Sequence, residues 1–147
     1  MAAMNLRDGQ LEQLADEHHR LRDVLGEVRE AVRDERTCVS TLIDLLVELT
    51  MVLRAHFDHE ENGGFFRDVE ADAPHLKPRS EALRAQHVSL CERLRVVRRC
   101  AERLPKDNCW MELSAAFDEF TTQFHEHETL EEELMQDAFG QDMGSKD

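Results

Sequence analysis

The sequence has few of the residues that interrupt helices. Its 147 residues include six glycines, three prolines and no tyrosine, and aromatic residues make up only 5%. Long unbranched side chains, which lose little conformational freedom on a helix, are plentiful instead. We therefore expect an all-α protein rather than a strand-rich one. A chain of this length can bury one hydrophobic core, so we expect a single domain over residues 1–147.

The sequence is also poor in positive charge. Eighteen lysines and arginines against 32 acidic residues give a formal net charge of −14, which repels nucleic-acid phosphates and anionic lipid surfaces. No apolar run approaches the roughly 18 residues of a transmembrane helix, and the N-terminus lacks the pattern of a secretion signal. We expect a soluble, cytoplasmic protein without a nucleic-acid or membrane partner. The sequence does not identify a protein partner.

Closely spaced cysteine pairs are absent. The four cysteines, Cys38, Cys91, Cys100 and Cys109, show no C-x-x-C spacing. In a chain of this size an even count alone is weak evidence for disulfides. We expect these thiols to be mostly reduced.

Short interruptions divide the sequence into four long helical segments. The segments run roughly over residues 8–34, 38–61, 79–104 and 108–138. The interruptions are the polar bend Asp34–Thr37, Asn62-Gly63-Gly64, the loop between Pro74 and Pro78, and the turn Leu104–Asn108. A short helical turn at Phe65–Val69 is a further candidate. At about 1.5 Å per residue each long segment can span a bundle, so we predict an antiparallel up-down-up-down four-helix bundle.

Each long segment carries apolar residues at alternating spacings of three and four, as expected for helices that pack in a bundle. Every one of these stripes contains a histidine in place of an aliphatic residue, and two contain a glutamate one turn later. The inward polar residues are His18, His56, Glu60, His87, His127 and Glu131. In an up-down-up-down bundle the four histidines fall near one level.

A single inward histidine is most simply a neutral ring that is hydrogen-bonded to a neighbour. An unpaired buried polar group costs about 1–3 kcal/mol, and an unpaired buried carboxylate costs more. Six such groups would be a heavy load on a net stability of about 5–15 kcal/mol. A cation that accepts all six as ligands removes this cost, so we predict a metal site. No separate catalytic or cofactor-binding residue is predicted.

Spacing separates the ligand candidates from neighbouring histidines. His56 has Glu60 four residues later, whereas His59 has a glycine there; likewise His127 has Glu131, whereas His125 has a threonine. On the first helix we favour His18 over His19, although His19 and Asp23 also stand four apart. His59 and Glu61, beside the predicted site, remain candidates for supporting or replacement ligands.

These residues resemble the hemerythrin-like family, also called the HHE cation-binding domain. The pattern is a lone histidine on the first helix, H-x3-E on the second, a histidine on the third and H-x3-E on the fourth. The stretches AHFDHEENGGFF, ALRAQHVSL and EHETLEEELMQDAF are also similar to bacterial members. The resemblance covers nearly the whole chain and implies one hemerythrin-like domain with an up-down four-helix bundle.

The resemblance implies a non-haem centre of two iron ions, joined by an oxo or hydroxo bridge. His18 and His56 would serve one iron, His87 and His127 the other, and Glu60 and Glu131 would bridge them. The identity of the metal depends on the family, because imidazole and carboxylate also suit manganese and zinc.

The sequence departs from the oxygen-carrying hemerythrins at one ligand position. Those proteins have a second histidine on the third helix where this chain has Cys91, and they have H-x4-D on the fourth helix. The resemblance therefore implies that the iron near His87 would have one protein ligand fewer. We interpret Cys91 as a buried apolar residue, with a thiolate ligand or redox-active thiol as the alternative.

Two functions follow from the resemblance. The first is binding of dioxygen or a related small molecule, in the sensing, storage or scavenging of oxygen, nitric oxide or iron. The alternative is an enzyme with peroxidase-like, catalase-like or ferroxidase activity, because an open metal position favours reaction with oxygen or peroxide. A metal-free helical interaction module is a third hypothesis, which leaves the six inward polar groups unexplained.

Overall fold

The computed structural model describes residues 2–140, with side chains described from residue 8 onward. Its helices are α1 (Ala2–Arg33), α2 (Val39–Asn62), α3 (Phe65–Asp72), the short 3-10 helix η1 (Pro74–Leu76), α4 (Lys77–Arg103) and α5 (Trp110–Phe139). No strand occurs in this part of the chain, so the predicted all-α class is confirmed.

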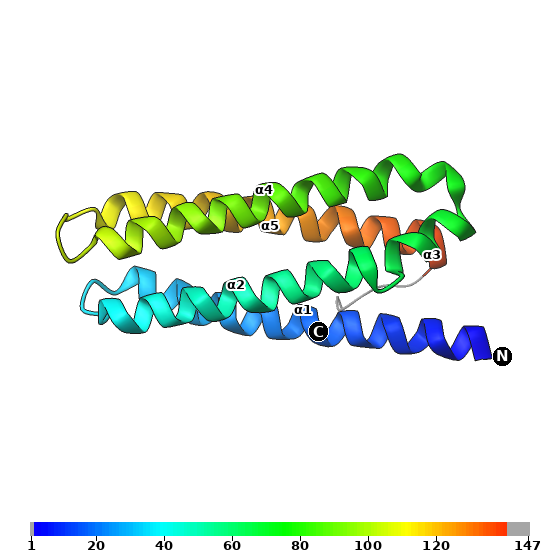
Figure 1. Cartoon of the computed structure of the whole chain (residues 1–147), viewed down its shortest axis with the longest axis horizontal. Helices are drawn as coiled ribbons and strands as arrows, with labels where there is room; N and C mark the ends of the chain where they lie inside the picture. Colours follow the sequence, from blue (N-terminus) through cyan, green and yellow to red (C-terminus); the bar gives the residue numbers. More distant parts are fainter. Residues whose placement is uncertain (1, 141–147) are drawn as a thin grey trace.

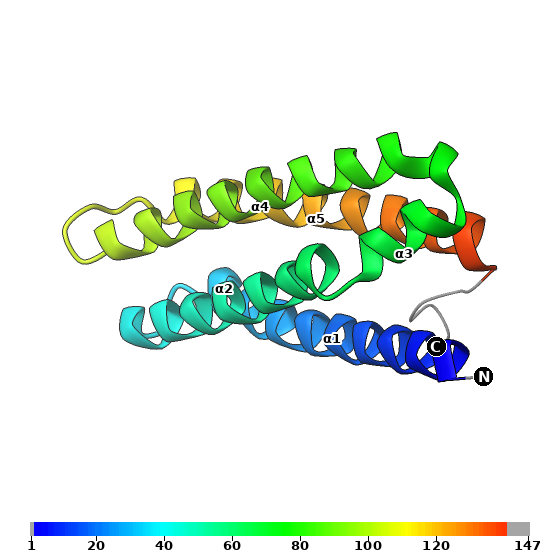
Figure 2. The same ribbon diagram turned by 45° about the vertical axis from the view of Figure 1, so that its right-hand side comes forward.

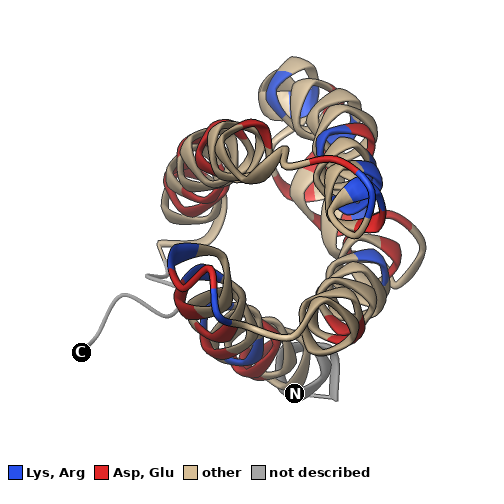
Figure 3. Cartoon of the chain, turned by 90° about the vertical axis from the view of Figure 1, so that its left-hand side faces the viewer, with Lys and Arg blue, Asp and Glu red and all other residues tan. Residues whose placement is uncertain are grey.

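The four long helices lie lengthwise beside one another (Figures 1 and 2). The α1–α2 and α4–α5 connections lie at one end of the molecule, and α3 lies at the other end (Figure 1). Helix α1 packs closely on α2, α4 packs on α5, and contacts between α2 and α4 join the two pairs. Viewed along the length of the bundle, the long helices are arranged around a common central axis (Figure 3).

The long helices begin and end within two residues of the predicted bounds, with one exception at the start of α1. This helix begins at Ala2, earlier than the expected residue 8. Its first residues are good helix formers, and Gly9 costs only about 1 kcal/mol inside a helix, which is too little to stop it. Pro78 lies in the first turn of α4 rather than in a loop, because a proline there loses no helical hydrogen bond.

Two glycines end α2 and turn the chain into α3. A methyl group on Gly63 would lie 2.5 Å from the carbonyl oxygen of His59, and Gly64 has a φ of +104°, which favours glycine. Helix α3 is longer than the short turn expected at Phe65–Val69. It places the buried Phe66 beside His87, with their ring centroids 5.8 Å apart.

Two apolar clusters fill the bundle, and the inward polar residues lie between them. The larger cluster includes Leu21 on α1, Leu53 on α2, Leu90 on α4 and Phe124 on α5. The smaller cluster includes Leu14 on α1, Phe66 on α3, Leu83 on α4 and Leu134 on α5. Along α1, α4 and α5, the inward histidine lies between a residue of the larger cluster and a residue of the smaller one. Helix α2 contributes only to the larger cluster.

None of the helices found between residues 2 and 140 combines the length and the apolar character that crossing a membrane requires.

The larger cluster should account for much of the stability of the bundle. Leu46 on α2 is fully buried in this cluster, whereas Met51 on the same helix is 66% exposed. We expect Leu46→Ala to lower the free energy of unfolding by about 2–5 kcal/mol, because it leaves a cavity. Met51→Ala should change it by less than about 0.5 kcal/mol. Urea unfolding measures both, and equal effects would contradict the position of the core.

Candidate metal centre

All six predicted inward residues meet at one level of the bundle, and each is at most 3% exposed. They form two overlapping groups of possible metal ligands, and within each group the ligand atoms lie within 4.8 Å of one another. The groups are His18, His56, Glu60 and Glu131, and Glu60, His87, His127 and Glu131. The two glutamates belong to both groups.

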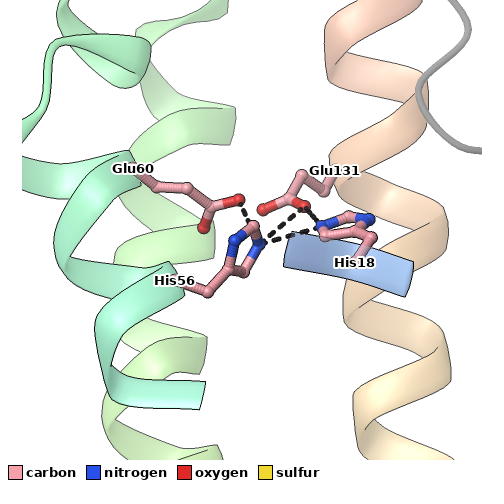
Figure 4. Close-up of side chains that lie close together, drawn as sticks. All are labelled: His18, His56, Glu60 and Glu131. Carbon is pink, nitrogen blue, oxygen red and sulfur yellow. Dashed lines mark hydrogen bonds and ion pairs between the residues drawn. The ribbon is translucent and has the colours of Figure 1, made fainter. Parts of the chain in front are cut away.

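The first group brings together side chains of α1, α2 and α5 (Figure 4). The Nε2 atoms of His18 and His56 are 2.9 Å apart. His18 Nε2 lies 2.8 Å from Oε1 of Glu131, and His56 Nε2 lies 3.1 Å from Oε2 of Glu60. All four side chains thus turn their ligand atoms toward one point.

The second group uses the other oxygen of each glutamate. Oε1 of Glu60 lies 2.9 Å from Nε2 of His87, and Oε2 of Glu131 lies 3.7 Å from Nε2 of His127. Each carboxylate therefore directs one oxygen to each pair of histidines. This is the arrangement in which a carboxylate can bridge two cations.

Several of these atoms have no hydrogen-bond partner among the described residues. They are both oxygens of Glu60, both oxygens of Glu131, and Nε2 of His87 and of His127. Some approach one another to about 3 Å, as given above, but without hydrogen-bond geometry. Unsatisfied buried polar atoms cost about 1–3 kcal/mol each, and imidazole nitrogens with carboxylate oxygens are good ligands for transition metals. The residues present fit a metal cation.

The two buried carboxyl groups cannot both ionise without a counter-charge. Burial raises the pKa of Glu60 well above its usual value, and the adjacent charge of Glu131 raises it further. Burial alone would also raise the pKa of Glu131, but Glu60 and the facing histidines hold it well below its usual value. Burial beside Glu131 thus disfavours the charged form of Glu60, whereas the neighbours of Glu131 favour its charged form.

The pKa values of His56 and His87 are shifted in opposite directions. Burial alone would lower the pKa of His56, but its contacts with the carboxyl groups of Glu60, Glu131 and Glu17 raise it well above the usual value. Burial, together with the nearby His127, lowers the pKa of His87 to about 3. His87 is therefore a neutral ring at neutral pH, which is the form that binds metals.

A second set of side chains contacts the outward ring nitrogens of the histidines. Nδ1 of His56 lies 2.7 Å from Oε1 of Glu17, and Nδ1 of His87 lies 2.5 Å from Oε2 of Glu61. Nδ1 of His127 lies 2.7 Å from Oε1 of Gln86. Nδ1 of His18 lies farther from its partner, 3.9 Å from Oε2 of Glu128. Metal-binding histidines are commonly oriented by such contacts, which leave the other ring nitrogen free for the metal.

Sequence reasoning found only one of these outer residues, Glu61, and left its role open. A signal for the other three does exist. Glu17, Gln86 and Glu128 are each next in sequence to an inward histidine. Successive residues are about 100° apart around a helix, so the neighbour of an inward residue points toward the adjacent helix.

The competing histidines lie outside both groups. His19 and His125 are exposed. His59 is also exposed, and its Nδ1 contacts Glu17 rather than the centre. His59 thus helps to position Glu17, which in turn contacts His56.

Phe57 has a role at the site that the sequence did not reveal. Its ring stacks on His87 with a centroid distance of 3.7 Å and an interplanar angle of 8°. Both rings border a cavity of about 380 Å³ between α2 and α4, which Arg54 and Cys91 also line. Cys91 belongs to neither ligand group, and burial raises the pKa of its thiol, as expected of an apolar wall residue.

Comparison with known families supports this site in the second half of the chain. The family model of the hemerythrin HHE cation binding domain matches residues 78–145. The predicted resemblance is thereby confirmed for the segment that carries His87, His127 and Glu131. Helices α1 and α2, with His18, His56 and Glu60, precede the matched segment. Comparisons with curated proteins and with solved structures gave no match.

Single substitutions should separate the inward histidines from their exposed neighbours. We expect His56→Ala and His127→Ala to lose most of the bound metal, because each removes a ligand atom from the centre. His59→Ala and His125→Ala should retain it. Metal analysis after desalting measures bound metal per chain, and far-UV circular dichroism checks that each variant folds. Loss of metal in His59→Ala but not in His56→Ala would contradict the assignment on α2.

Proposed function

We propose that the chain is a single hemerythrin-like domain, an antiparallel up-down-up-down bundle that holds two iron ions and binds dioxygen or a related small molecule. One observation carries this proposal. Glu60 and Glu131, both fully buried, each direct one oxygen to each pair of inward histidines, and none of the four oxygens has a hydrogen-bond partner among the described residues.

The proposed assignment follows the two ligand groups. His18 and His56 hold one iron, His87 and His127 hold the other, and the two glutamates bridge them. The family match adds cation binding as the expected function of the segment that contains His87 and His127. Iron is proposed on the family's chemistry, because the ligand types alone also suit manganese and zinc.

When bound, a pair of iron ions supplies electrons that can be shared with dioxygen or lost to it. The chain controls what reaches the ions. All six proposed ligands are at most 3% exposed, and apolar clusters close the centre on both sides. A large substrate cannot approach such a centre, whereas dioxygen, nitric oxide or peroxide can. The cavity beside Phe57 and His87 comes nearest to the ligands from the α2–α4 side.

An enzyme is the second candidate, because each proposed iron has only four protein ligands. Iron accepts up to six, so positions remain for water or for a reacting molecule. Cys91 does not fill one of them, since it belongs to neither ligand group. These unfilled coordination positions favour peroxide breakdown or oxidation of ferrous iron over simple reversible binding of dioxygen.

A reducing compartment suits this protein. All four cysteines are free, and two of them, Cys100 and Cys109, are buried. These free thiols favour the cytoplasm as the place of action.

Visible spectra during gas exchange separate the two functions. We load the full chain with ferrous iron under nitrogen, then change to oxygen, then return to nitrogen. About two iron ions per chain and a reversible spectral change are expected for oxygen binding. Irreversible oxidation with turnover of peroxide would instead support the enzyme.

The control compares two variants of the same helix. Glu131→Ala should bind less than about one iron ion per chain, because it removes a bridge from both ions. His125→Ala should match the wild type in iron content and spectrum. Absence of stoichiometric iron in the wild type would overturn both proposed functions.

A further inference from the structure

The outer contacts of the four inward histidines follow the order of the helices around the bundle. A side chain on each long helix faces the histidine on the next: α1 serves α2, α2 serves α4, α4 serves α5, and α5 serves α1. In this order the pairs are Glu17 with His56, Glu61 with His87, Gln86 with His127 and Glu128 with His18. Three of the four outer residues are acidic, and Gln86 is the neutral exception.

An ionised carboxylate fixes the position of a proton on the imidazole ring. Its oxygens can only accept hydrogen bonds, so Nδ1 of the histidine must donate. The proton then stays on Nδ1, and Nε2 keeps the lone pair that a cation needs. Glu61 does this for His87, and Glu17 faces Nδ1 of His56 from the corresponding position on α1.

Gln86 imposes no such choice on His127. Its amide carries one accepting oxygen and one donating nitrogen, and a half-turn of the amide exchanges them. The structure has Oε1 of Gln86 2.7 Å from Nδ1 of His127. The reversed amide would donate to Nδ1 instead and would leave the ring proton on Nε2, where it blocks a cation.

The inner side of His127 also draws the proton toward Nε2. Oε2 of Glu131 lies 3.7 Å from this nitrogen. His87 also has a carboxylate on its inner side, since Oε1 of Glu60 lies 2.9 Å from its Nε2. On its outer side, however, the carboxylate of Glu61 lies 2.5 Å from Nδ1, where His127 has only the amide of Gln86. The two histidines of the second ligand group therefore differ in their outer partner, which is a carboxylate for His87 and an amide for His127.

A small cavity gives the Gln86 amide room to turn. The cavity, of about 130 Å³ between α4 and α5, is lined by Gln86, Ser89, Leu90, Gln123, Glu126 and His127. It is large enough and polar enough for water, which can bond the amide in either orientation. The half-turn therefore leaves no amide group without a partner.

We propose that Gln86 is the positioning residue of His127 and that its neutral amide makes His127 a weak, displaceable ligand of the centre. A carboxylate at the same place would hold His127 firmly. The inference rests on the proposed metal function, and it predicts the position at which an imidazole gives way to a chelator or an incoming small molecule.

Exchange of a bound metal tests this role directly, with Co²⁺ as the probe. The full chain is loaded with Co²⁺ and mixed with an excess of chelator, and the loss of the cobalt absorption gives the release rates. Gln86→Glu should slow the release from the second ligand group on the order of tenfold. Gln123→Glu adds the same charge to the same cavity without a contact to His127, and should change the rate less than about twofold.

A matched pair on the other side of the centre tests the converse. Glu61→Gln replaces the carboxylate at His87 with an amide and should speed release, on the order of tenfold. Glu92→Gln removes a carboxylate that lines the same 380 Å³ cavity but is paired with Arg95, and should leave the rate unchanged. Equal effects within either pair would overturn the inference while leaving metal binding intact. A wild-type chain that binds no Co²⁺ would overturn the proposed function as well.

A second measurement needs no variant. Nitrogen-15 spectra of the histidine rings in the metal-free wild type at pH 8 report which ring nitrogen carries the proton. We expect a single form with the proton on Nδ1 for His87, and an exchanging mixture of both forms for His127. A single Nδ1-protonated form at His127 would contradict the role of Gln86.

Discussion

The meeting of two carboxyl groups in a dry interior is the constraint on which the rest of the structure depends. Glu60 and Glu131 are fully buried, and burial together with the adjacent Glu131 raises the pKa of Glu60 well above its usual value. Four imidazole rings surround them, and apolar clusters separate them from solvent on both sides. A cation changes the repulsion between the carboxylates into shared attraction, which gives a physical reason for a polar layer in an otherwise apolar core.

Much of this layer could be predicted from the sequence, because helical periodicity is a strong signal. A histidine that replaces leucine in a stripe such as Leu49, Leu53, His56 must point inward, and Glu60 one turn later must point the same way. The structure places these side chains together, as it does His87 and His127. The early start of α1 was missed, since the good helix formers before Gly9 carry little weight in a pattern of apolar spacing.

The surroundings of the ligands could not be predicted as well, because they depend on which helices become neighbours. Glu17 and Gln86 look like solvated surface residues in the sequence, and only the order of the helices around the bundle aims them at His56 and His127. The stacking of Phe57 on His87 likewise depends on how closely α2 approaches α4. The outer contacts nevertheless decide how firmly each histidine is held. Because Gln86 is an amide and the other three outer residues are carboxylates, His127 is held less firmly than the other histidines.

Anomalous diffraction from crystals grown with ferrous iron tests the central claim most directly. Data collected on the two sides of the iron absorption edge locate iron without reference to the protein atoms. We predict two peaks, one beside His18 and His56 and the other beside His87 and His127, with Glu60 and Glu131 reaching both. A map without iron at this level, or with iron held by His59 or His125 instead, would contradict the account.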